Sequence, residues 1–434
     1  MTRRAAIAVV RAALLWLAAD FGLAAGFGLA PAGPAHAQTF QTLAPHAILI
    51  DADTGAVLFE KAADELFSPA SMAKLMTVEV IFNEMRRGRL SLDSEVMITE
   101  SAWKRGGAGA GGSSMFAQVN SRVKLPDLLR GIIVQSGNDA AIAAGEAIAG
   151  TEDQFGRMMT NRAREIGLTR SVFRNATGFS DPAQKVTARE IARLSIHLIE
   201  TYPDLYRIFG EREFTWNKIR QQNRNPLLAM DMGADGLKTG FLEESGYALA
   251  GSAVQNGQRL VVVLSGLKTA RDRAAEARKL VDWGFRAFEP RQLFAANEPV
   301  GEASVFGGAS GGVSLVAKKP VRLLVPRGSN ERVLARIVYQ GPVRAPVEAG
   351  APLGRLMVTR GEVQALDLPL YTAAEVPVGT LSQRALDGLI EAGTGLVRKA
   401  FGKTSELGKT SALGKTSALG TTSALGKISA AGGA

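Results

Sequence analysis

A serine and a lysine stand three residues apart in the segment SPASMAK, and such a pair could carry out acyl transfer. Ser71 and Lys74 occupy positions i and i+3, which share one face if the segment is helical. A lysine acts as a base only if its pKa falls from about 10.4 towards neutrality. Burial and a neighbouring cation would both lower that pKa. The spacing therefore suggests a serine nucleophile with a lysine base, although a pair of this kind also arises by chance.

The composition argues against the other common nucleophiles and bases. The chain of 434 residues has no cysteine and three histidines, His36, His46 and His197. Thiolate chemistry and disulfides are therefore excluded, and we expect no metal and no other cofactor. A Ser-His-Asp triad would need His46, which follows a proline in an expected hairpin, or His197. A lone histidine on an amphipathic helix is more often structural, so the lysine remains the favoured base.

Two further motifs strengthen the interpretation of the Ser-x-x-Lys pair as part of an active site. Ser136-Gly137-Asn138 places a hydroxyl and an amide on a tight turn. Lys238-Thr239-Gly240 lies on an expected edge strand and supplies a cation, a hydroxyl and a glycine that permits close approach. The order S-x-x-K, S-x-N and K-T-G is typical of penicillin-binding proteins and β-lactamases. Together the three motifs predict one cleft with three walls.

The chain resembles a low-molecular-mass penicillin-binding protein of the serine-type D-alanyl-D-alanine carboxypeptidase family. The resemblance covers about residues 40–380 and is carried by SPASMAKLMT, GSSMF, LLRGIIVQSGNDAA, NATGF and DGLKTGF. It implies an α+β transpeptidase domain of the serine β-lactamase type, with an antiparallel sheet flanked by helices. It also implies removal of the terminal D-alanine from peptidoglycan stem pentapeptides through an acyl-enzyme, which regulates cross-linking, and covalent inhibition by β-lactams.

The resemblance also implies a role for each site residue. Ser71 attacks the carbonyl, Lys74 takes its proton and Ser136 relays the proton to the leaving amine. The implied substrate-binding residues are Asn138, Lys238, Thr239, Gly240 and Arg224, and the implied oxyanion hole is formed by the backbone N–H groups of Ser71 and Phe241. For Arg224, in QNRNPLL, a structural role is the alternative. Phe241-Leu242 departs from the His-Thr that relatives often carry after K-T-G, which puts rate, pH profile and substrate preference in question.

Three other functions compete with the carboxypeptidase reading. A β-lactamase would share the motifs, but the sequence shows no obvious E-x-x-x-N-type loop with a deacylating glutamate. A D,D-endopeptidase that cuts cross-links would use the same residues, and the sequence separates it poorly from a carboxypeptidase. A non-catalytic scaffold that binds the cell wall is the alternative from another class, and the intact motif residues argue against it.

The elements that must position these motifs can be placed from the sequence. Residues 47–60 predict a hairpin, and Ser68 with Pro69 predicts the N-cap and first turn of a buried helix. Residues 126–150 predict two helices, and 187–200 a helix opened by a capping box. Residues 234–266 predict strands with a tight turn at 256–257, and 270–288 a closing helix. These elements form an α+β domain over 38–288.

The two ends of the chain predict export and contact with a membrane. Residues 1–37 have the basic start, apolar run and small-x-small ending of a signal peptide. Residues 289–380 predict a small all-β domain, 381–401 an amphipathic helix, and 402–434 a hexapeptide-repeat tail. The formal charge of +10 favours acidic wall polymers or anionic lipids over nucleic acid. We therefore expect a protein of the periplasm or cell envelope, associated peripherally with the outer leaflet of the cytoplasmic membrane.

Overall fold

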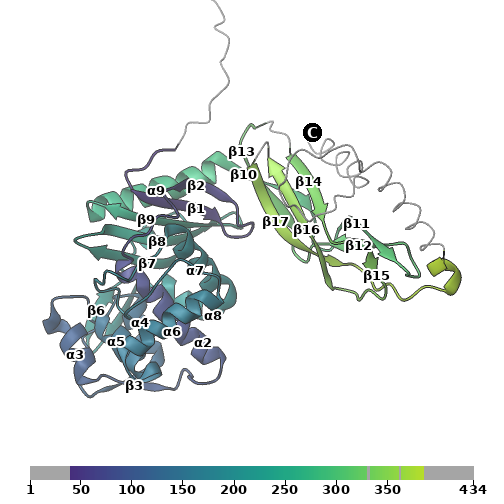
Figure 1. Ribbon diagram of the computed structural model, residues 1–434. Helices are drawn as coiled ribbons and strands as arrows, with labels where there is room; N and C mark the ends of the chain where they lie inside the picture. The colour runs from purple at the N-terminus through teal and green to yellow at the C-terminus, as the bar shows by residue number, and fades with distance from the viewer. Residues whose placement is uncertain (1–39, 330–332, 361–362, 386–434) are drawn as a thin grey trace, which may run out of the picture. The chain divides into compact units, whose positions relative to one another are not determined.

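A computed structural model describes residues 40–329, 333–360 and 363–385 of the chain (Figure 1). The predicted signal peptide lies outside these residues, as does most of the predicted amphipathic helix, of which 381–385 are described and helical. The repeat tail lies outside them too. Within the described residues, no helix is both long and apolar enough to cross a bilayer.

A five-stranded antiparallel sheet organises the N-terminal part. Its strand order is β2-β1-β9-β8-β7, so the last strand of this row has one unpaired edge. The strands are β1 (His46–Asp51), β2 (Val57–Lys61), β7 (Ala234–Leu242), β8 (Gly246–Gln255) and β9 (Gln258–Leu267). The tight turn predicted at 256–257 joins β8 to β9 and is confirmed, with both of its residues at positive φ as such turns require.

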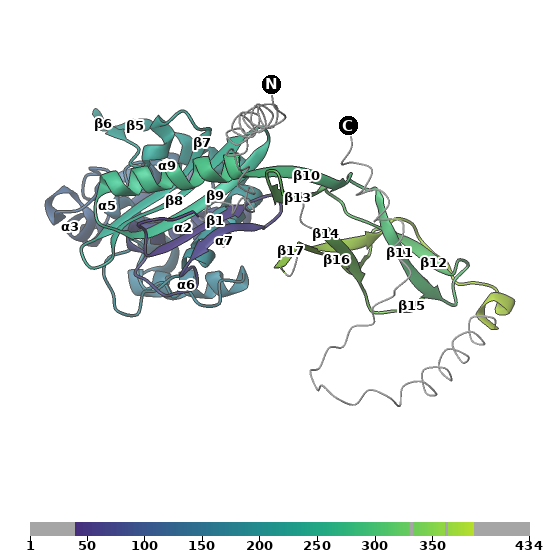
Figure 2. The same ribbon diagram turned by 90° about the horizontal axis from the view of Figure 1, so that it is seen from above.

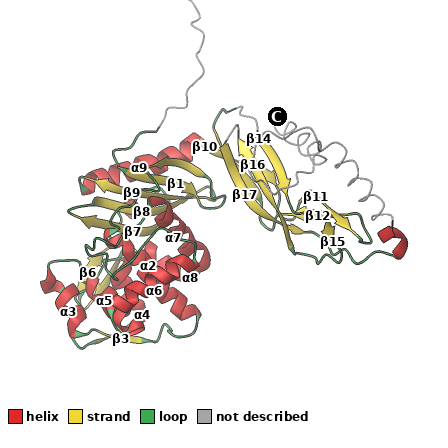
Figure 3. Cartoon of the chain, in the orientation of Figure 1, coloured by secondary structure: helices red, strands yellow, loops and turns green. Residues whose placement is uncertain are grey.

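Helices cover both faces of this sheet (Figures 1 and 3). The long closing helix α9 (Ala270–Ala287) packs on β8 and β9, and α7 (Ala188–Thr201) packs on β1 and β9 from the other face (Figure 2). Alternating strand residues separate the two layers, since Leu49 meets α9 whereas Ile48 and Ile50 join the helical core. The other helices are α2 (Lys74–Arg86), α3 (Glu100–Gly106), α4 (Leu125–Ile133), α5 (Asn138–Ala149), α6 (Glu152–Glu165) and α8 (Pro203–Tyr206).

Short two-stranded ribbons and 3₁₀ turns lie between these helices and the strands of the sheet along the chain. Two-stranded ribbons are formed by β3 (Glu95–Met97) with β4 (Arg122–Lys124), and by β5 (Glu213–Trp216) with β6 (Ile219–Gln222). Single 3₁₀ turns are η1 (Ala70–Ala73), η2 (Ala108–Ala110), η3 (Arg207–Gly210) and η4 (Pro226–Ala229).

The start of the helix that carries Lys74 differs from the prediction. We expected Ser68 as the N-cap of one continuous helix, but Pro69 precedes a 3₁₀ turn, η1, and no side chain caps it. The Ser68 hydroxyl instead accepts a hydrogen bond from Lys185 Nζ at 3.0 Å. Ala70, which lies between Pro69 and the nucleophile Ser71, has a φ of 50°. Residues with a Cβ rarely adopt this conformation. Ser71 thus lies in a tight turn ahead of α2.

A buried ion cluster joins the three helices α2, α6 and α7. Glu79, fully buried on α2, accepts three hydrogen bonds from Arg162 of α6, at 2.9, 3.0 and 3.2 Å. His197 of α7 lies 3.2 Å from the same carboxylate. Burial opposes ionisation, but the hydrogen bonds from His197 and Arg162 hold the pKa of Glu79 below its usual value. The expectation that His197 is structural agrees with this placement. The predicted cap at Thr187 is also confirmed, since its side chain accepts from Glu190 N.

The C-terminal part consists of strands, as predicted, around an apolar core of its own. A six-stranded sheet has the order β14-β16-β17-β12-β11-β15, and β10 pairs with β13. Buried valines and leucines such as Val313, Leu323 and Leu356 fill this core. The strands are β10 (Phe288–Phe294), β11 (Pro299–Phe306), β12 (Gly312–Val316), β13 (Val321–Pro326), β14 (Val333–Val338), β15 (Val343–Arg344), β16 (Pro352–Arg360) and β17 (Val363–Thr372).

Candidate active site

The predicted nucleophile and base are in contact. Lys74 Nζ lies 3.1 Å from Ser71 Oγ, 2.7 Å from Asn138 Oδ1 and 2.7 Å from the carbonyl oxygen of Thr177. The side chain is buried, with 1% of its surface exposed. The amide oxygen and the carbonyl oxygen can only accept hydrogen bonds. A neutral amine would therefore direct its two N–H groups at these oxygens and its lone pair at the serine hydroxyl.

The surroundings of Lys74 favour this neutral form. Burial, followed by the positive charge of Arg224, lowers the pKa of Lys74 to about 7. The carboxylates of Asp139 and Glu152 oppose this shift. At neutral pH a large fraction of the amine is therefore unprotonated and able to accept a proton.

The second wall of the cleft is formed where α4 ends and α5 begins. Asn138 opens α5, and its backbone N–H donates to the Ser113 carbonyl at 2.7 Å. Ser136 is buried, lines the cleft and has a φ of 66°. Among the described residues, its hydroxyl has no hydrogen bond to Ser71 or Lys74. The structure thus brings Ser136 to the cleft without a hydrogen bond from its hydroxyl to either of these two residues.

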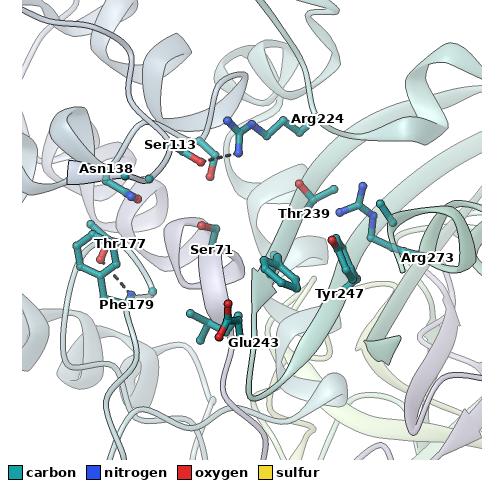
Figure 4. Close-up of a pocket in the computed structure, with 18 residues that line it drawn as sticks. Ser71, Ser113, Asn138, Thr177, Phe179, Arg224, Thr239, Glu243, Tyr247 and Arg273 are labelled. Carbon is teal, nitrogen blue, oxygen red and sulfur yellow. Dashed lines mark hydrogen bonds between the residues drawn. The ribbon is translucent and has the colours of Figure 1, made fainter. Parts of the chain in front are cut away.

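A glycine-rich loop after α3 forms the rim above this wall. The fully buried carboxylate of Asp139 holds the loop, since it accepts hydrogen bonds from Ser114 Oγ at 2.7 Å and Met115 N at 2.9 Å. Ser113, one residue earlier, lines the cleft and accepts a hydrogen bond from Arg224 (Figure 4). This loop therefore holds the side chain of a candidate substrate-binding arginine.

A loop in the NATGF segment completes the pocket around Lys74. Asn175 Oδ1 accepts from the backbone N–H groups of Gly178 at 2.7 Å and Phe179 at 3.1 Å, which shapes the loop and presents the Thr177 carbonyl. Gly178 has a φ of 84°, and a Cβ there would lie 1.8 Å from the carbonyl oxygen of Ala70. Only glycine permits this approach to the turn that carries the nucleophile.

The third wall is β7, which is an edge strand of the sheet, as predicted. Thr239, Gly240 and Phe241 line the cleft. A Cβ on Gly240 would lie 3.1 Å from both the Ala70 Cβ and the Pro69 carbonyl oxygen, which confirms the expected close approach. Lys238 is buried, and its Nζ donates to the Thr239 carbonyl at 3.1 Å.

Positive charge gathers at one end of the cleft. Burial, followed by repulsion from Lys74, Arg224 and Arg273, holds the pKa of Lys238 well below its usual value. Arg273 of α9 lines the cleft, and its guanidinium carbon lies 5.7 Å from the centre of the Tyr247 ring. Its Nε is buried without a hydrogen-bond partner among the described residues. These cations suit a substrate that ends in a carboxylate.

The cleft has a volume of about 810 Å³ and holds the features that acyl transfer needs. It contains a serine hydroxyl beside a buried amine and a cluster of cations that can fix an anionic end group. Ser71 and Phe241 both line it, so the residues expected to supply the oxyanion donors lie on two of its walls. No group of three potential metal ligands occurs among the residues that the structure covers.

The fold and this cleft define a serine acyltransferase of the penicillin-binding class, and sequence comparison agrees. The chain belongs to the D-alanyl-D-alanine carboxypeptidase family, peptidase S11, whose model matches residues 33–269. A second model, described as the C-terminal domain of penicillin-binding protein 5, matches residues 288–378. The predicted family and fold class are therefore confirmed.

Individual relatives extend the match over most of the chain. D-alanyl-D-alanine carboxypeptidase DacC of Escherichia coli is 36% identical over 84% of this chain and 94% of its own length. Penicillin-binding protein 5 from Haemophilus influenzae is a solved structure with a TM-score of 0.70 and 33% identity, covering 78% of this chain and 98% of that one. Penicillin-binding protein D2 from Listeria monocytogenes, solved in its ampicillin-bound form, has a TM-score of 0.51 and 27% identity over 57% of this chain and 98% of that one.

Several residues of the cleft were not predicted from the sequence. Thr177 acts through its carbonyl oxygen, which every residue type carries, so no sequence signal could single it out. Asp139 and Ser113 lie within the quoted segments LLRGIIVQSGNDAA and GSSMF but were given no role, and the buried carboxylate next to Asn138 could have been noticed. Arg273 lies in a helix with several other arginines, and nothing in their spacing separates it from them.

Proposed function

We propose that this protein is a serine-type D-alanyl-D-alanine carboxypeptidase that removes the terminal D-alanine from peptidoglycan stem peptides. The observation that carries the proposal is the geometry of Lys74, whose two carbonyl-type acceptors leave its lone pair facing Ser71 Oγ. The family membership supports the same activity.

In the proposed mechanism, Ser71 attacks the carbonyl between the two D-alanines while Lys74 accepts its proton. The backbone N–H groups of Ser71 and Phe241 stabilise the oxyanion. The proton then passes by way of Ser136 to the nitrogen of the leaving D-alanine. The C–N bond breaks, an ester to Ser71 remains, and water hydrolyses this ester to restore the free hydroxyl.

The remaining residues hold the substrate. Asn138 orients Lys74 and binds the substrate amide. Lys238, Thr239 and Arg224 bind the terminal carboxylate, with Gly240 allowing the substrate to approach β7. The hydrogen bond from Arg224 to Ser113 supports this role, because it holds the guanidinium at the cationic end of the cleft.

Two measurements on the wild-type chain test the proposal. A fluorescent penicillin should label the protein covalently at Ser71, and a pentapeptide ending in D-Ala-D-Ala should lose one D-alanine. Ser71→Ala should abolish both, and Lys74→Ala should slow labelling by several orders of magnitude while the protein stays folded. A wild-type chain that neither labels nor releases D-alanine would refute the proposal. Cross-linked dimers assayed in parallel would reveal endopeptidase activity.

We also propose that the protein is exported and touches the membrane from outside the cytoplasm. The support is the signal-like segment 1–37 and the tail from 381, which carries seven Lys/Arg and three Asp/Glu, a net charge of +4. The mature chain should sediment with vesicles of anionic lipid and be released by salt. A chain that remains in the supernatant with such vesicles would rule out the membrane contact.

A further inference from the structure

The carbonyl oxygen that orients Lys74 belongs to a loop, and the residue before it in the chain is held from two sides. Thr177 O accepts from Lys74 Nζ at 2.7 Å, and Figure 4 shows Thr177 next to Asn138, on one side of Ser71. The preceding residue, Ala176, is fully buried, and side chains of two helices bind its carbonyl oxygen and its N–H group. The position of the oxygen that the base contacts therefore depends on these two side chains.

A threonine of α2 binds the carbonyl oxygen of Ala176. Thr77 Oγ1 donates to this oxygen at 2.8 Å, and the Thr77 side chain is fully buried. Thr77 follows Lys74 by three residues in the same helix, so the two side chains share one face of α2. The helix that carries the base therefore also holds the peptide next to the oxygen that orients the base.

A carboxylate at the start of α6 binds the N–H group of Ala176. Glu152 is 8% exposed, and its Oε1 accepts from Ala176 N at 3.3 Å. Its Oε2 forms an ion pair with Arg105 of α3. Glu152 lies in the first turn of α6, where the free N–H groups of a helix favour a negative charge. Both oxygens of the carboxylate are thus fixed, one by the loop and one by the arginine.

The charge of Glu152 also acts on the base. Among the cations around Lys74, Arg224 lowers its pKa, and Lys238 is close enough for the two lysines to repel each other. The carboxylates of Asp139 and Glu152 act in the opposite direction and raise the pKa of Lys74. Asp139 binds the glycine-rich loop, so Glu152 is the carboxylate of this pair that also holds the loop around the base.

We infer that Thr77 and Glu152 are positioning residues for the base, because they hold the backbone of Ala176 from two sides and thereby place the Thr177 carbonyl oxygen against Lys74. Neither of the two is among the residues that line the cleft, so they act without touching the substrate. This inference rests on the proposed function, because it concerns the step in which the serine gives up its proton. It adds two residues that lie outside the three motifs.

The pH profile of penicillin labelling separates the orientation of the amine from its charge. Well above a pKa of about 7 the amine of Lys74 is neutral, so the second-order rate constant reaches a plateau that reports orientation. The pH at which the rate constant is half of the plateau reports the pKa. Thr77→Val keeps the shape of the side chain and removes the hydroxyl, and its plateau should fall by about ten- to hundredfold, as small displacements of a catalytic group do. Thr77→Ser keeps a hydroxyl and should restore most of the plateau.

Glu152→Gln tests the carboxylate. Its amide oxygen can still accept from Ala176 N but is a weaker acceptor than a carboxylate, so the plateau should fall by about two- to fivefold. The half-maximal pH should move to a lower value, because a negative charge that raises the pKa of Lys74 is lost. A residue that only supported the fold would not move this pH.

Thr160→Val is the matched control. Thr160 Oγ1, on α6, donates to the carbonyl oxygen of Phe173 at 2.8 Å, three residues before Ala176 in the same segment. The variant therefore removes a hydrogen bond of the same kind, but from a residue that is not next to the oxygen bound by Lys74. Like Thr77→Val, it should melt at a lower temperature than the wild type, while it keeps the wild-type plateau and half-maximal pH. Labelling is measured below the melting temperature of every variant.

The outcomes separate this inference from the proposed function. A plateau in Thr77→Val equal to that of the wild type or of Thr160→Val would overturn the inference and leave the proposed function standing. A half-maximal pH in Glu152→Gln at or above the wild-type value would overturn it as well, and this result decides alone if Thr77→Val does not fold. A wild-type chain that does not label at all would refute the proposed function and this inference with it.

Discussion

The pH dependence of acylation offers a quantitative test of Lys74 as the base. Its pKa is lowered to about 7 by burial and then by Arg224, and the neutral form is the active one. The neutral fraction is then about 9% at pH 6 and about 91% at pH 8, so acylation should rise about tenfold and level off above pH 8. A lysine with its ordinary pKa of about 10.4 would instead gain about a hundredfold over the same range and continue to rise.

The assay is the second-order rate constant for labelling by a fluorescent penicillin, measured between roughly pH 5.5 and 9.5 at constant ionic strength. At low penicillin concentration this constant reports the pKa of the free enzyme. Arg224→Gln removes a charge that lowers the pKa of Lys74. The pH at which the labelling rate constant falls on the acidic side should therefore be higher in this variant than in the wild type. Arg157→Gln, an exposed change on α6, is the matched control, and its labelling rate constant should fall at the same acidic pH as that of the wild type.

Two results would refute this reasoning. A rate that climbs tenfold per pH unit beyond pH 9 would show that Lys74 keeps an ordinary pKa. An acidic limb at the same pH in Arg224→Gln and the wild type would show that the arginine charge does not act on the base. The first result would refute the lowered pKa of Lys74, and the second would refute the contribution of Arg224 to it.

Two further predictions concern stability. Gly178→Ala should unfold more easily than the control Gly167→Ala by about 1–3 kcal/mol, because both glycines have positive φ but only the first Cβ would collide with Ala70; equal melting temperatures would contradict this. Glu79→Gln should cost about 3 kcal/mol near pH 7 by leaving Arg162 without its buried partner. Because the pKa of Glu79 is lowered in the folded state, its stabilisation is present above the usual carboxyl pKa and is lost as pH falls, so the difference in melting temperature should shrink in acid. A difference independent of pH would count against the ion pair.

The sequence predicted the motif residues of the site better than it predicted their backbone. The three motifs converge on one cleft, and the edge position of Lys238-Thr239-Gly240 followed from the strand pattern. The N-cap at Ser68 was wrong because good local capping chemistry was overridden by the tight turn around Ala70. That turn is imposed by segments far away in the sequence, and a local pattern carries no information about them.

The contacts of Lys74 illustrate what the residue pattern could not show. Its partner in α5 was expected from the S-x-N motif, whereas the backbone oxygen from the NATGF loop was not. Residue type identifies a candidate for chemistry, but the fold decides which candidates share a cavity.

The acceptors around Lys74 also connect reactivity to the order of folding. One of them lies 64 residues and another 103 residues further along the chain, so the base can be desolvated and oriented only after three distant segments have come together. Contacts of such long range form late and require most of the domain to be in place. A partly folded chain would present Ser71 beside a solvated, protonated lysine and would not react. Penicillin labelling during refolding should therefore count native molecules, so that the nucleophile serves as a built-in reporter of completed folding.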